Sequence, residues 1–391
     1  MTTVLISGAG IAGPALARWL GRNGFDVTVV ERAAGVRPGG QAVDVRGPTH
    51  RSLLERMGVF EEVRATRMPR TDWRLVDGAD RVKAVLPGEL LGGDLEILRG
   101  DLAAILHRHS AADAEYVFGD EILALRQTPS GVDIEFARGA ARRYDIVVGA
   151  DGVHSAVRRL AFGPDGDHLR ARGGYYAVFG AAVPLDGLPT RSPDGRAIAY
   201  AYNEPGRLVV LGGQKAPGQL VFRAPGPDYD RHDTASQLRF VQRAFRGAGW
   251  RTPQALRAAA DSTDFYLDAL VRTRMTAFTR GRVALVGDAG QANTLGGFGT
   301  GLALIGAHVL AGELLVARGD HATAFPAYDR IMRRATRPAR SGDAGRVLAP
   351  ASRLGIRLRD LSFANPAMRA AQLRLARRLA TDERIPHYGM A

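Results

Sequence analysis

The amino-acid sequence predicts an α/β protein in which a Rossmann-like domain carries an inserted mixed β-sheet domain and a C-terminal helical segment. Three observations predict this arrangement. A buried strand at residues 4–7 ends in glycines that open a helix, alternating apolar runs separated by Pro and Gly fill residues 165–275, and the pattern from residue 320 onward is helical. The chain therefore leaves the first domain and later returns to it.

The first part of the chain has βαβ character. Gly24 stops the first helix, and a second helix is expected to have Thr49 as its N-cap and Gly58 as its stop. We expect helices at residues 11–23, 49–57 and 100–110, and strands at 27–31 and near 115–125, 131–138 and 144–149.

The middle of the chain is a mostly antiparallel or mixed sheet with two helices, and the last part is helical. We expect strands at 176–183, 196–202, 208–212, 220–223 and 282–286, and helices near 233–246, 253–260 and 300–317, with later breaks at Pro338, Pro350 and Pro366. The expected domains are a discontinuous first domain (1–70, 95–165 and 275–335), an inserted domain (71–94 and 166–274) and a helical segment (336–391).

Length and composition restrict the class of protein. A chain of 391 residues with 46% hydrophobic and 24% charged residues predicts two or three globular domains rather than a disordered protein. The absence of cysteine excludes disulfides, thiolate chemistry and Cys-ligated metal. We see no secretory signal and no apolar run long enough to span a bilayer, so we expect a cytoplasmic protein with no membrane partner.

The net charge of +13 does not by itself indicate nucleic-acid binding. Lysine occurs only twice, so nearly all basic residues are arginine, and residues 331–391 hold thirteen arginines and four acids. Most of the excess therefore belongs to the C-terminal segment, and no recognition motif accompanies it. We expect a solvated, basic helical tail and no nucleic-acid partner.

The glycines Gly8, Gly10 and Gly13 fit the dinucleotide-binding pattern G-x-G-x-x-G. They follow a strand, open a helix, and precede Glu31 at the end of the next strand. Gly8 permits the tight turn, Gly10 lets backbone approach a pyrophosphate, and Gly13 allows close packing of helix on strand. Glu31 accepts a hydrogen bond from a ribose hydroxyl in this arrangement. The pattern alone does not distinguish NAD from FAD.

Two later strands also end in acidic residues. Asp151 follows the strand near 144–149 and is followed by Gly152 and, at the start of a helix, Ser155. Asp288 follows the strand at 282–286 and leads through a glycine-rich loop into the helix near 300. An acid at a strand end binds sugar or ribitol hydroxyls, and a helix N-terminus stabilises negative charge on a reduced flavin ring.

These segments, taken with Arg99, resemble one family: the single-component (group A) FAD-dependent aromatic hydroxylases with the para-hydroxybenzoate hydroxylase fold. The resemblance covers about residues 1–335 and rests on the G-x-G-x-x-G turn, the Gly149–Gly152 strand end and the later Gly287-Asp288. Within the family the chain looks most like the short bacterial branch that contains the tetracycline-inactivating monooxygenases. The segments 39–47, 99–102 and 265–268 carry that closer likeness.

The resemblance implies FAD as cofactor, NADPH or NADH as reductant, and roles for the matching residues. The implied cofactor-binding residues are Gly8, Gly10, Ile11, Ala12 and Gly13 around the pyrophosphate, Glu31 and Arg32 at the adenosine ribose, Arg99 at the phosphates, Ile122 at the adenine, Asp151 where pyrophosphate and NADPH approach, Asp288 at the ribitol or phosphate, and Gly299, Thr300, Gly301 and Leu302 at the flavin pyrimidine edge. Residues 39–46 would run beside the isoalloxazine.

The chain departs from the family in the loop after Asp288. The family follows Gly-Asp-Ala with Ala-His and a later Pro, whereas this sequence has Gly290-Gln291 and Thr294-Leu295. The loop also aligns only with one residue deleted, so two glycine pairs, at 297 and 299 or at 299 and 301, compete for the flavin contact. These changes bear on oxygen activation more than on FAD binding.

The implied chemistry is transfer of one oxygen atom from a flavin C4a-hydroperoxide to a polycyclic aromatic or polyketide-like molecule, in natural-product tailoring or antibiotic inactivation. The substrate and O2 are then the small-molecule partners, and no side chain is expected to act as a catalytic acid or nucleophile because the flavin carries the chemistry. Tyr200 and Tyr202 share one face of a strand, and we predict that this face, with Phe222 as a third residue, lines the substrate cavity. No metal site is expected.

Other classes stay open on the residues alone. The altered loop is compatible with an FAD-dependent reductase or dehydrogenase that does not incorporate oxygen. An NAD-only dehydrogenase would lack flavin affinity, and a non-enzymatic binder would use the basic tail. The oligomeric state, monomer or homodimer, is also open, because the helix at about 366–380 could cap the first domain or pair with another subunit.

Overall fold

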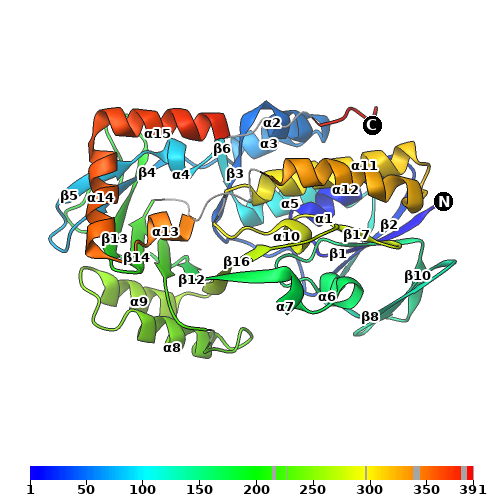
Figure 1. The fold of residues 1–391 in the computed structure, drawn as a ribbon, viewed down its shortest axis with the longest axis horizontal. Coiled ribbons are helices and arrows are strands. Elements are labelled where there is room, and N and C mark those ends of the chain that lie inside the picture. Colours follow the sequence, from blue (N-terminus) through cyan, green and yellow to red (C-terminus); the bar gives the residue numbers. More distant parts are fainter. Residues whose placement is uncertain (214–216, 227, 296, 338–343, 380–384, 391) are drawn as a thin grey trace.

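The computed structural model describes residues 1–391 apart from 214–216, 227, 296, 338–343, 380–384 and 391. Two large sheets organise the molecule (Figure 1). One has six strands and lies on the side of the N-terminus, and the other has seven strands and lies on the opposite side. Helices follow at the C-terminal end, so the predicted α/β fold with a mixed second sheet and a C-terminal helical segment is confirmed.

The six-stranded sheet brings the predicted cofactor residues to one edge. Its order is β17 (Thr279–Arg280), β18 (Val283–Leu285), β11 (Ile146–Gly149), β1 (Thr3–Ser7), β2 (Asp26–Glu31) and β7 (Glu115–Phe118). All neighbours are parallel except β17 and β18. The last residue of β1, Ser7, pairs with Gly149 on one side and with Val30 on the other. The carboxyl ends of three strands therefore meet where a doubly wound sheet binds its ligand.

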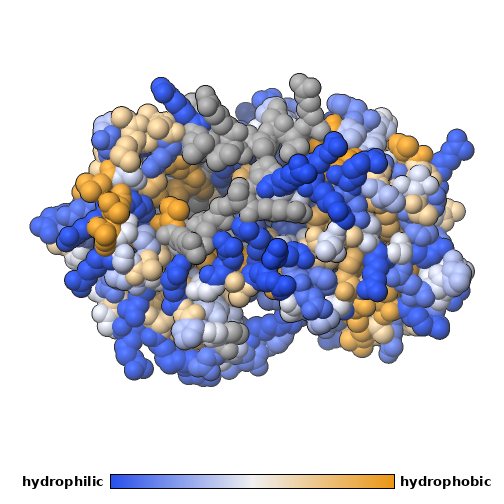
Figure 2. All heavy atoms as spheres, viewed as in Figure 1, coloured by the Kyte–Doolittle hydropathy of each residue, from blue (hydrophilic) through white to orange (hydrophobic). Residues whose placement is uncertain are grey.

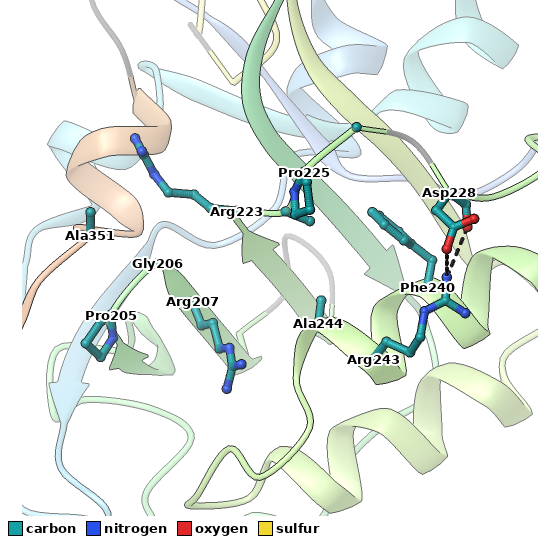
Figure 3. Close-up of a pocket in the computed structure, with 12 residues that line it drawn as sticks. Pro205, Gly206, Arg207, Arg223, Pro225, Asp228, Phe240, Arg243, Ala244 and Ala351 are labelled. Atoms are coloured by element: carbon teal, nitrogen blue, oxygen red, sulfur yellow. Dashed lines mark hydrogen bonds and ion pairs between the residues drawn. The ribbon is translucent and has the colours of Figure 1, made fainter.

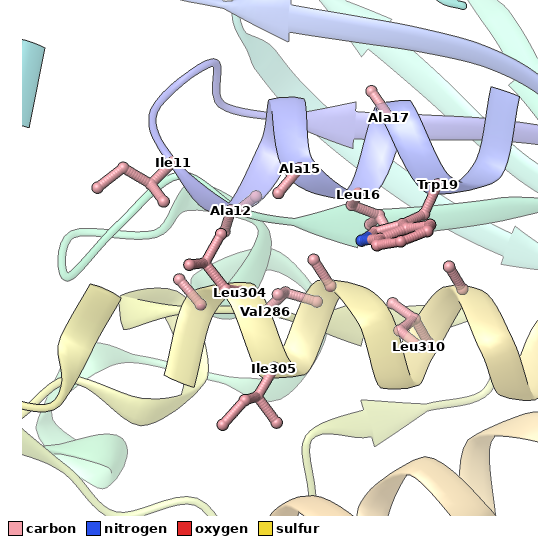
Figure 4. Close-up of a cluster of buried hydrophobic side chains, with 14 of the residues drawn as sticks. Ile11, Ala12, Ala15, Leu16, Ala17, Trp19, Val286, Leu304, Ile305 and Leu310 are labelled. Carbon is pink, nitrogen blue, oxygen red and sulfur yellow. The ribbon is translucent and has the colours of Figure 1, made fainter. Parts of the chain in front are cut away.

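Four helices pack around this sheet: α1 (Ala12–Arg22), α5 (Arg99–Ser110), α11 (Gly299–Val316) and α12 (His321–Ala335). Ala12 and Leu16 of α1 and Leu304 of α11 belong to the apolar cluster packed between these two helices (Figure 4). By length and composition α11 alone among the described helices could cross a membrane, but 72% of it is buried inside the protein, as in the core helix of a soluble domain.

Smaller elements extend this half of the molecule. The strands β8 (Ile122–Thr128), β9 (Gly131–Phe136) and β10 (Arg142–Tyr144) form an antiparallel sheet near α6 (Ala156–Phe162), and β3 (Ala42–Val45) pairs with β6 (Leu95–Leu98). The helices α2 (Gly47–Arg56), α3 (Phe60–Ala65), α7 (Asp165–His168) and α10 (Asp288–Gln291) complete it.

The predicted N-cap of α2 was wrong. The helix begins two residues earlier than Thr49, and its N-cap residue is Arg46, which makes no side-chain cap bond. Pro48 lies in the first turn, where the fixed φ of proline suits a helix start and its missing N–H costs nothing. The proline therefore determines where the helix begins.

The seven-stranded sheet is mixed. Its order is β16 (Tyr266–Thr273), β12 (Leu169–Phe179), β15 (Gly218–Phe222), β14 (Arg207–Gly212), β13 (Ala197–Glu204), β4 (Thr71–Val76) and β5 (Val82–Leu86). Neighbours are antiparallel except β13 and β4. The strands β3 to β6 were not predicted from alternation. The domain boundaries drawn from the sequence stay a prediction.

The two faces of this sheet have different neighbours. One face packs against α8 (Thr234–Ala244) and α9 (Thr252–Asp261). The opposite face, which we call the inner face, packs against Leu295 from the loop before α11 and against residues of α13 (Ala344–Leu348) and α14 (Arg353–Ala364). The inner face is therefore the side of the sheet that meets the first half of the molecule.

The C-terminal segment first covers the seven-stranded sheet and then returns to the six-stranded half of the molecule. The helix α14 packs on β5 and β13, and α15 (Pro366–Leu379) contacts α14 and α4 (Gly88–Leu91). After the undescribed residues 380–384, the chain end lies on α11. There Pro386 accepts a hydrogen bond at its carbonyl from His308 Nε2 at 3.2 Å, and the Tyr388 hydroxyl donates to Glu313 Oε1 at 2.7 Å.

Replacing Gly13 by alanine is expected to destabilise the whole first half. A Cβ at Gly13 would overlap the carbonyl oxygen of Gly8, and that residue cannot move away because its N–H donates to Val30 at 2.7 Å. We expect Gly13→Ala to lower the free energy of unfolding by about 3 kcal/mol or more, measured by urea denaturation. Gly35→Ala is the control, since its Cβ would meet open space. Equal stability of the two variants would contradict this account.

Candidate cofactor and substrate site

The turn between β1 and α1 is shaped for close approach of a ligand to backbone. Gly8 has a φ of +110°, which favours glycine, and a Cβ there would lie 2.6 Å from the Ala150 carbonyl oxygen. The first turn of α1 follows directly, with Ile11 at the N-cap position and no side chain capping its N–H groups. A Cβ at Gly10 would meet only the Arg99 guanidinium, at 3.7 Å. This geometry suits a pyrophosphate between the helix N-terminus and an arginine.

Glu31 braces this turn. Its carboxylate accepts from the Ala9 N–H at 2.9 Å and from the Ala33 N–H at 2.8 Å. The backbone of Glu31 in turn accepts from the Asp120 N–H at 3.2 Å, so the start of β8 at Ile122 lies beside it. Ile122 is buried and Arg32 is exposed. A carboxylate has about four acceptor positions, and the remaining ones suit ribose hydroxyls.

Asp151 sits beside Gly8 with half of its carboxylate unused. Oδ2 accepts from the N–H groups of Ala156 at 2.8 Å and Val157 at 3.2 Å. Oδ1 is buried and has no hydrogen-bond partner among the described residues. Burial raises the pKa of this carboxyl, and the bonds at Oδ2 oppose the rise. Ser155 acts as the predicted early-helix hydroxyl, because it caps α6 by accepting from the Arg158 N–H.

Asp288 follows β18 and faces the start of α11. Its side chain is exposed to solvent, and yet desolvation by the surrounding protein raises its pKa, against the opposing charge of Arg99. Exposure to solvent and a pKa raised by desolvation occur together in a side chain that protein surrounds on most sides and that solvent reaches from one. A Cβ at Gly299 would lie 3.3 Å from Asp288 Oδ1, so the carboxylate faces the N-terminus of α11. The predicted residues Gly299, Thr300, Gly301 and Leu302 form that first turn.

The segment 39–46 runs between these groups. Gly39 accepts from the Gly100 N–H at 2.9 Å, and the segment thereby joins the start of α5. At its other end, the guanidinium of Arg46 would lie 3.3 Å from a Cβ at Gly297. The predicted cofactor residues at the ends of β1, β2, β11 and β18 and at the starts of α5 and α11 are therefore brought together at one end of the six-stranded sheet. Their contacts with FAD stay a prediction, and the unpartnered oxygen of Asp151 and the open glycine turn fit it.

The altered loop after Asp288 has a local packing reason. A Cβ at Gly290 would lie 3.0 Å from the Phe278 ring and 3.2 Å from Leu285, so a residue with a side chain is crowded there. Leu295 adopts a φ of +59°, which is uncommon for a residue other than glycine, and its side chain packs on the inner face. The loop therefore places an apolar side chain between the two halves of the molecule.

A hydrogen-bonded cluster that the sequence reasoning missed crosses the same boundary. Asp268 on β16 is buried and accepts from the Tyr266 hydroxyl at 2.8 Å. His154 Nε2, from the loop after β11, lies 3.1 Å from Asp268 Oδ1. Tyr266 is 39% exposed, and its ring centroid lies 5.8 Å from that of Tyr176. Desolvation raises the pKa of both tyrosines. The only sequence signal was the segment 265–268, which served as a family likeness.

The structure corrects the prediction that Tyr200, Tyr202 and Phe222 line the substrate cavity. Phe222 is fully buried against Phe240 of α8, on the face opposite the inner face. Tyr200 is also fully buried, and its hydroxyl donates to the Pro189 carbonyl at 2.8 Å. Tyr202 stacks on Trp250. Period-2 spacing correctly placed the two tyrosines on one face, but at that position the face packs against the loop residues Leu185, Leu188 and Trp250 and lies opposite the inner face.

A separate hollow of about 550 Å³ opens where β13, β14, β15 and α8 meet, and its walls include Arg207, Arg223 and Arg243 (Figure 3). Arg243 is paired with Asp228 at 2.7 Å. None of the predicted cofactor residues lines this hollow, so we do not assign it to the cofactor site.

Comparison with known proteins identifies the class. The family model of the FAD binding domain matches residues 1–325. A flavin-dependent monooxygenase of Legionella longbeachae is 36% identical over 340 residues, 84% of this chain and 85% of that protein. An uncharacterised protein of Mycobacterium tuberculosis is 39% identical over 84% of this chain and 89% of its own length. The crystal structure of the tetracycline destructase Tet(55) superposes with a TM-score of 0.81 at 32% identity, covering 98% of both chains.

The chain therefore belongs to the FAD-binding monooxygenase family. It is an FAD-dependent monooxygenase, an oxidoreductase that acts on a small molecule with O2. The resemblance drawn from the glycine turn and the two strand-end acids is confirmed, including its likeness to tetracycline-inactivating enzymes.

Replacing Asp151 by asparagine is expected to stabilise the protein without FAD. The carboxyl has a folded-state pKa above its unfolded value, so its ionisation disfavours the folded state as the pH rises past the unfolded pKa of about 3.9. We expect the midpoint of thermal unfolding of Asp151→Asn to exceed that of the wild type by a margin that grows as the pH rises above about 4 and levels off above the raised pKa of the carboxyl. Asp26→Asn, at an exposed position, is the control. A pH-independent difference would contradict the assignment.

Proposed function

We propose that this enzyme uses NADPH or NADH and O2 to hydroxylate a polycyclic aromatic or polyketide-like molecule, in antibiotic inactivation or natural-product tailoring. The observation that carries the proposal is the likeness to Tet(55), which extends over nearly the whole of both chains and includes the C-terminal helices. A likeness confined to the first sheet would support only FAD binding.

The inner face supports a large apolar substrate. It is built from aromatic and aliphatic side chains, and it is the side of the sheet against which the loop before α11 packs. Its members include Trp73, Leu75, Tyr176, Val178, Ala201, Leu208, Val210, Val221 and Leu270, with Leu295 packed against them. An apolar surface of this kind suits fused rings better than a small polar acid. Its members are only 1–7% exposed in the structure, so the substrate would reach them only after Leu295 or the covering helices move.

The chain's own residues would divide the work around FAD. When bound, FAD supplies the redox chemistry of oxygen activation. The first turn of α1 and Arg99 would hold the pyrophosphate, and the N–H groups at the start of α11 would face the pyrimidine edge. Leu295 and the inner face would exclude water from the reacting atoms.

The Tyr266–Asp268–His154 cluster supplies the proton acceptor that a phenolic substrate needs. A substrate hydroxyl that donates to Tyr266 can pass its proton through Asp268 to His154, whose side chain is 40% exposed to solvent. A phenol that loses its proton is more electron-rich and therefore a better acceptor of an electrophilic oxygen.

Labelled oxygen tests the proposed reaction. The FAD-loaded protein is incubated with 18O2, with NADPH or NADH, and with tetracycline as probe, and the product is analysed by mass spectrometry. We expect one 18O atom in the product and oxidation of the reductant that depends on the probe. A product without 18O, across tetracycline and other polycyclic phenols, would overturn the proposal in favour of the non-oxygenating reductase.

Tyr266→Phe is expected to lower kcat for a phenolic substrate by about tenfold or more and to change KM little, because the variant removes the first group of the proton path. Stability should change little, since Tyr266 is partly exposed. Tyr229→Phe, on the opposite face of the same sheet, is the matched control. The effect is measured by steady-state kinetics with a substrate whose product contains 18O in the preceding experiment. An unchanged kcat would show that Tyr266 takes no part in the mechanism.

A further inference from the structure

The helix α14 exposes an apolar stripe that no part of the described chain covers. Leu354, Leu358 and Leu361 are 65%, 59% and 65% exposed. Their spacing of four and three residues places them on one face of the helix. Hydrophobic atoms gather at the edge of the molecule where α14 lies (Figure 2). We call these three side chains the leucine stripe. Val347 of α13 and Met368 of α15 add further exposed apolar side chains on the neighbouring helices.

The leucine stripe is not needed to hold α14 in place. The opposite face of the helix buries Phe363 against the inner face of the seven-stranded sheet. Arg359 fixes the helix further, because its guanidinium donates to Asn203 Oδ1 at 2.8 Å and to the Leu348 carbonyl at 3.2 Å. The helix is therefore anchored from behind and presents its leucines outward from the edge strand β5.

The three helices that carry the leucine stripe and its apolar neighbours are strongly basic. Residues 344–379 contain eight arginines and a single acid, Asp360, which pairs with Arg359 at 2.7 Å. Arg353 and Arg357 are exposed on the same helix as the stripe. In the part of the chain that the structure describes, neither takes part in an ion pair. Exposed leucines with flanking unpaired arginines fit a surface that is apolar inside and anionic outside.

A second copy placed by a two-fold axis through the middle of α14 meets this requirement less well than an anionic surface does. A two-fold axis through the middle of α14 would bring Leu358 against its own copy, and it would also bring the adjacent Arg357 against its own copy. With one acid in the three helices, and that acid already paired, the like charges would stay uncompensated. The phosphates of an anionic bilayer compensate them directly.

We propose that α14 docks this enzyme on an anionic lipid surface. The leucine stripe enters the boundary of the acyl chains, and Arg353 and Arg357 lie among the phosphate groups, with the helix in the plane of the membrane. The sequence had predicted no membrane partner because no segment could span a bilayer, but a helix that lies on the surface needs no span. Docking would bring the seven-stranded sheet next to the lipid. This inference does not depend on the substrate.

Vesicle binding tests the proposal with the full-length, FAD-loaded protein. Flotation is measured with vesicles of phosphatidylglycerol and phosphatidylcholine in equal parts, and with vesicles of phosphatidylcholine alone. We expect binding to the anionic vesicles that is at least about tenfold stronger than to the neutral ones and that weakens at high salt. The triple variant Leu354→Ser, Leu358→Ser, Leu361→Ser and the double variant Arg353→Gln, Arg357→Gln should each lose about tenfold or more.

Leu123→Ser is the matched control, because Leu123 is 53% exposed on β8, in the other half of the molecule. Its binding should equal that of the wild type, and all variants should keep the wild-type thermal midpoint and flavin absorption. Failure of the wild type to float with anionic vesicles overturns the proposal, as does undiminished binding of the triple variant. A wild-type dimer in light scattering that the triple variant converts to monomer also overturns it and assigns the stripe to a second copy.

Discussion

The arrangement of the predicted cofactor residues depends on the close approach of backbone to backbone at the turn between β1 and α1. Gly8 lies against the Ala150 carbonyl, and Gly13 lies against the carbonyl of Gly8, with no room for a side chain at either position. These two contacts lock β1, α1 and the loop after β11 into one unit. Because Asp151 belongs to that loop, these backbone contacts help to fix its position relative to the N-terminus of α1.

Two carboxylates, those of Asp151 and Asp288, lie at the same end of the six-stranded sheet. Asp151 and Asp288 have pKa values raised by burial, and Arg99 is the cation that faces Asp288. Asp151 and Asp288 would repel a bound pyrophosphate, and the helix N-termini of α1 and α11 would supply compensating positive potential. The carboxylates suit hydroxyl groups of a sugar or ribitol chain, and the helix ends suit the charged parts.

Most elements of the six-stranded sheet, and the strand-end positions of the glycine turn, Asp151 and Asp288, were predicted from the sequence because they depend on local rules, whereas β3 to β6 were not. Glycine spacing, strand-end acids and apolar periodicity are properties of neighbouring residues, and parallel pairing then brings the strand ends together. Which face of the seven-stranded sheet is covered does not depend on neighbouring residues in the sequence. Tyr200 and Tyr202 share a face by periodicity, yet only the packing of distant residues such as Leu185 and Trp250 decides that this face is covered. Likewise, nothing in the spacing of His154 and Asp268 indicates that residues 114 positions apart meet.

The chain end has a practical consequence. Met390 is 8% exposed, and the ring of Tyr388 occupies the space above Gly312, which leaves no room for a side chain on that helix face. The neighbouring His308 has its pKa lowered to about 4 by burial beneath this segment. A fusion tag attached at the carboxyl terminus would disturb residues that pack on α11, such as Tyr388 and Met390. Met1, in contrast, is 87% exposed. Purification handles and labels for this protein therefore belong at the amino terminus.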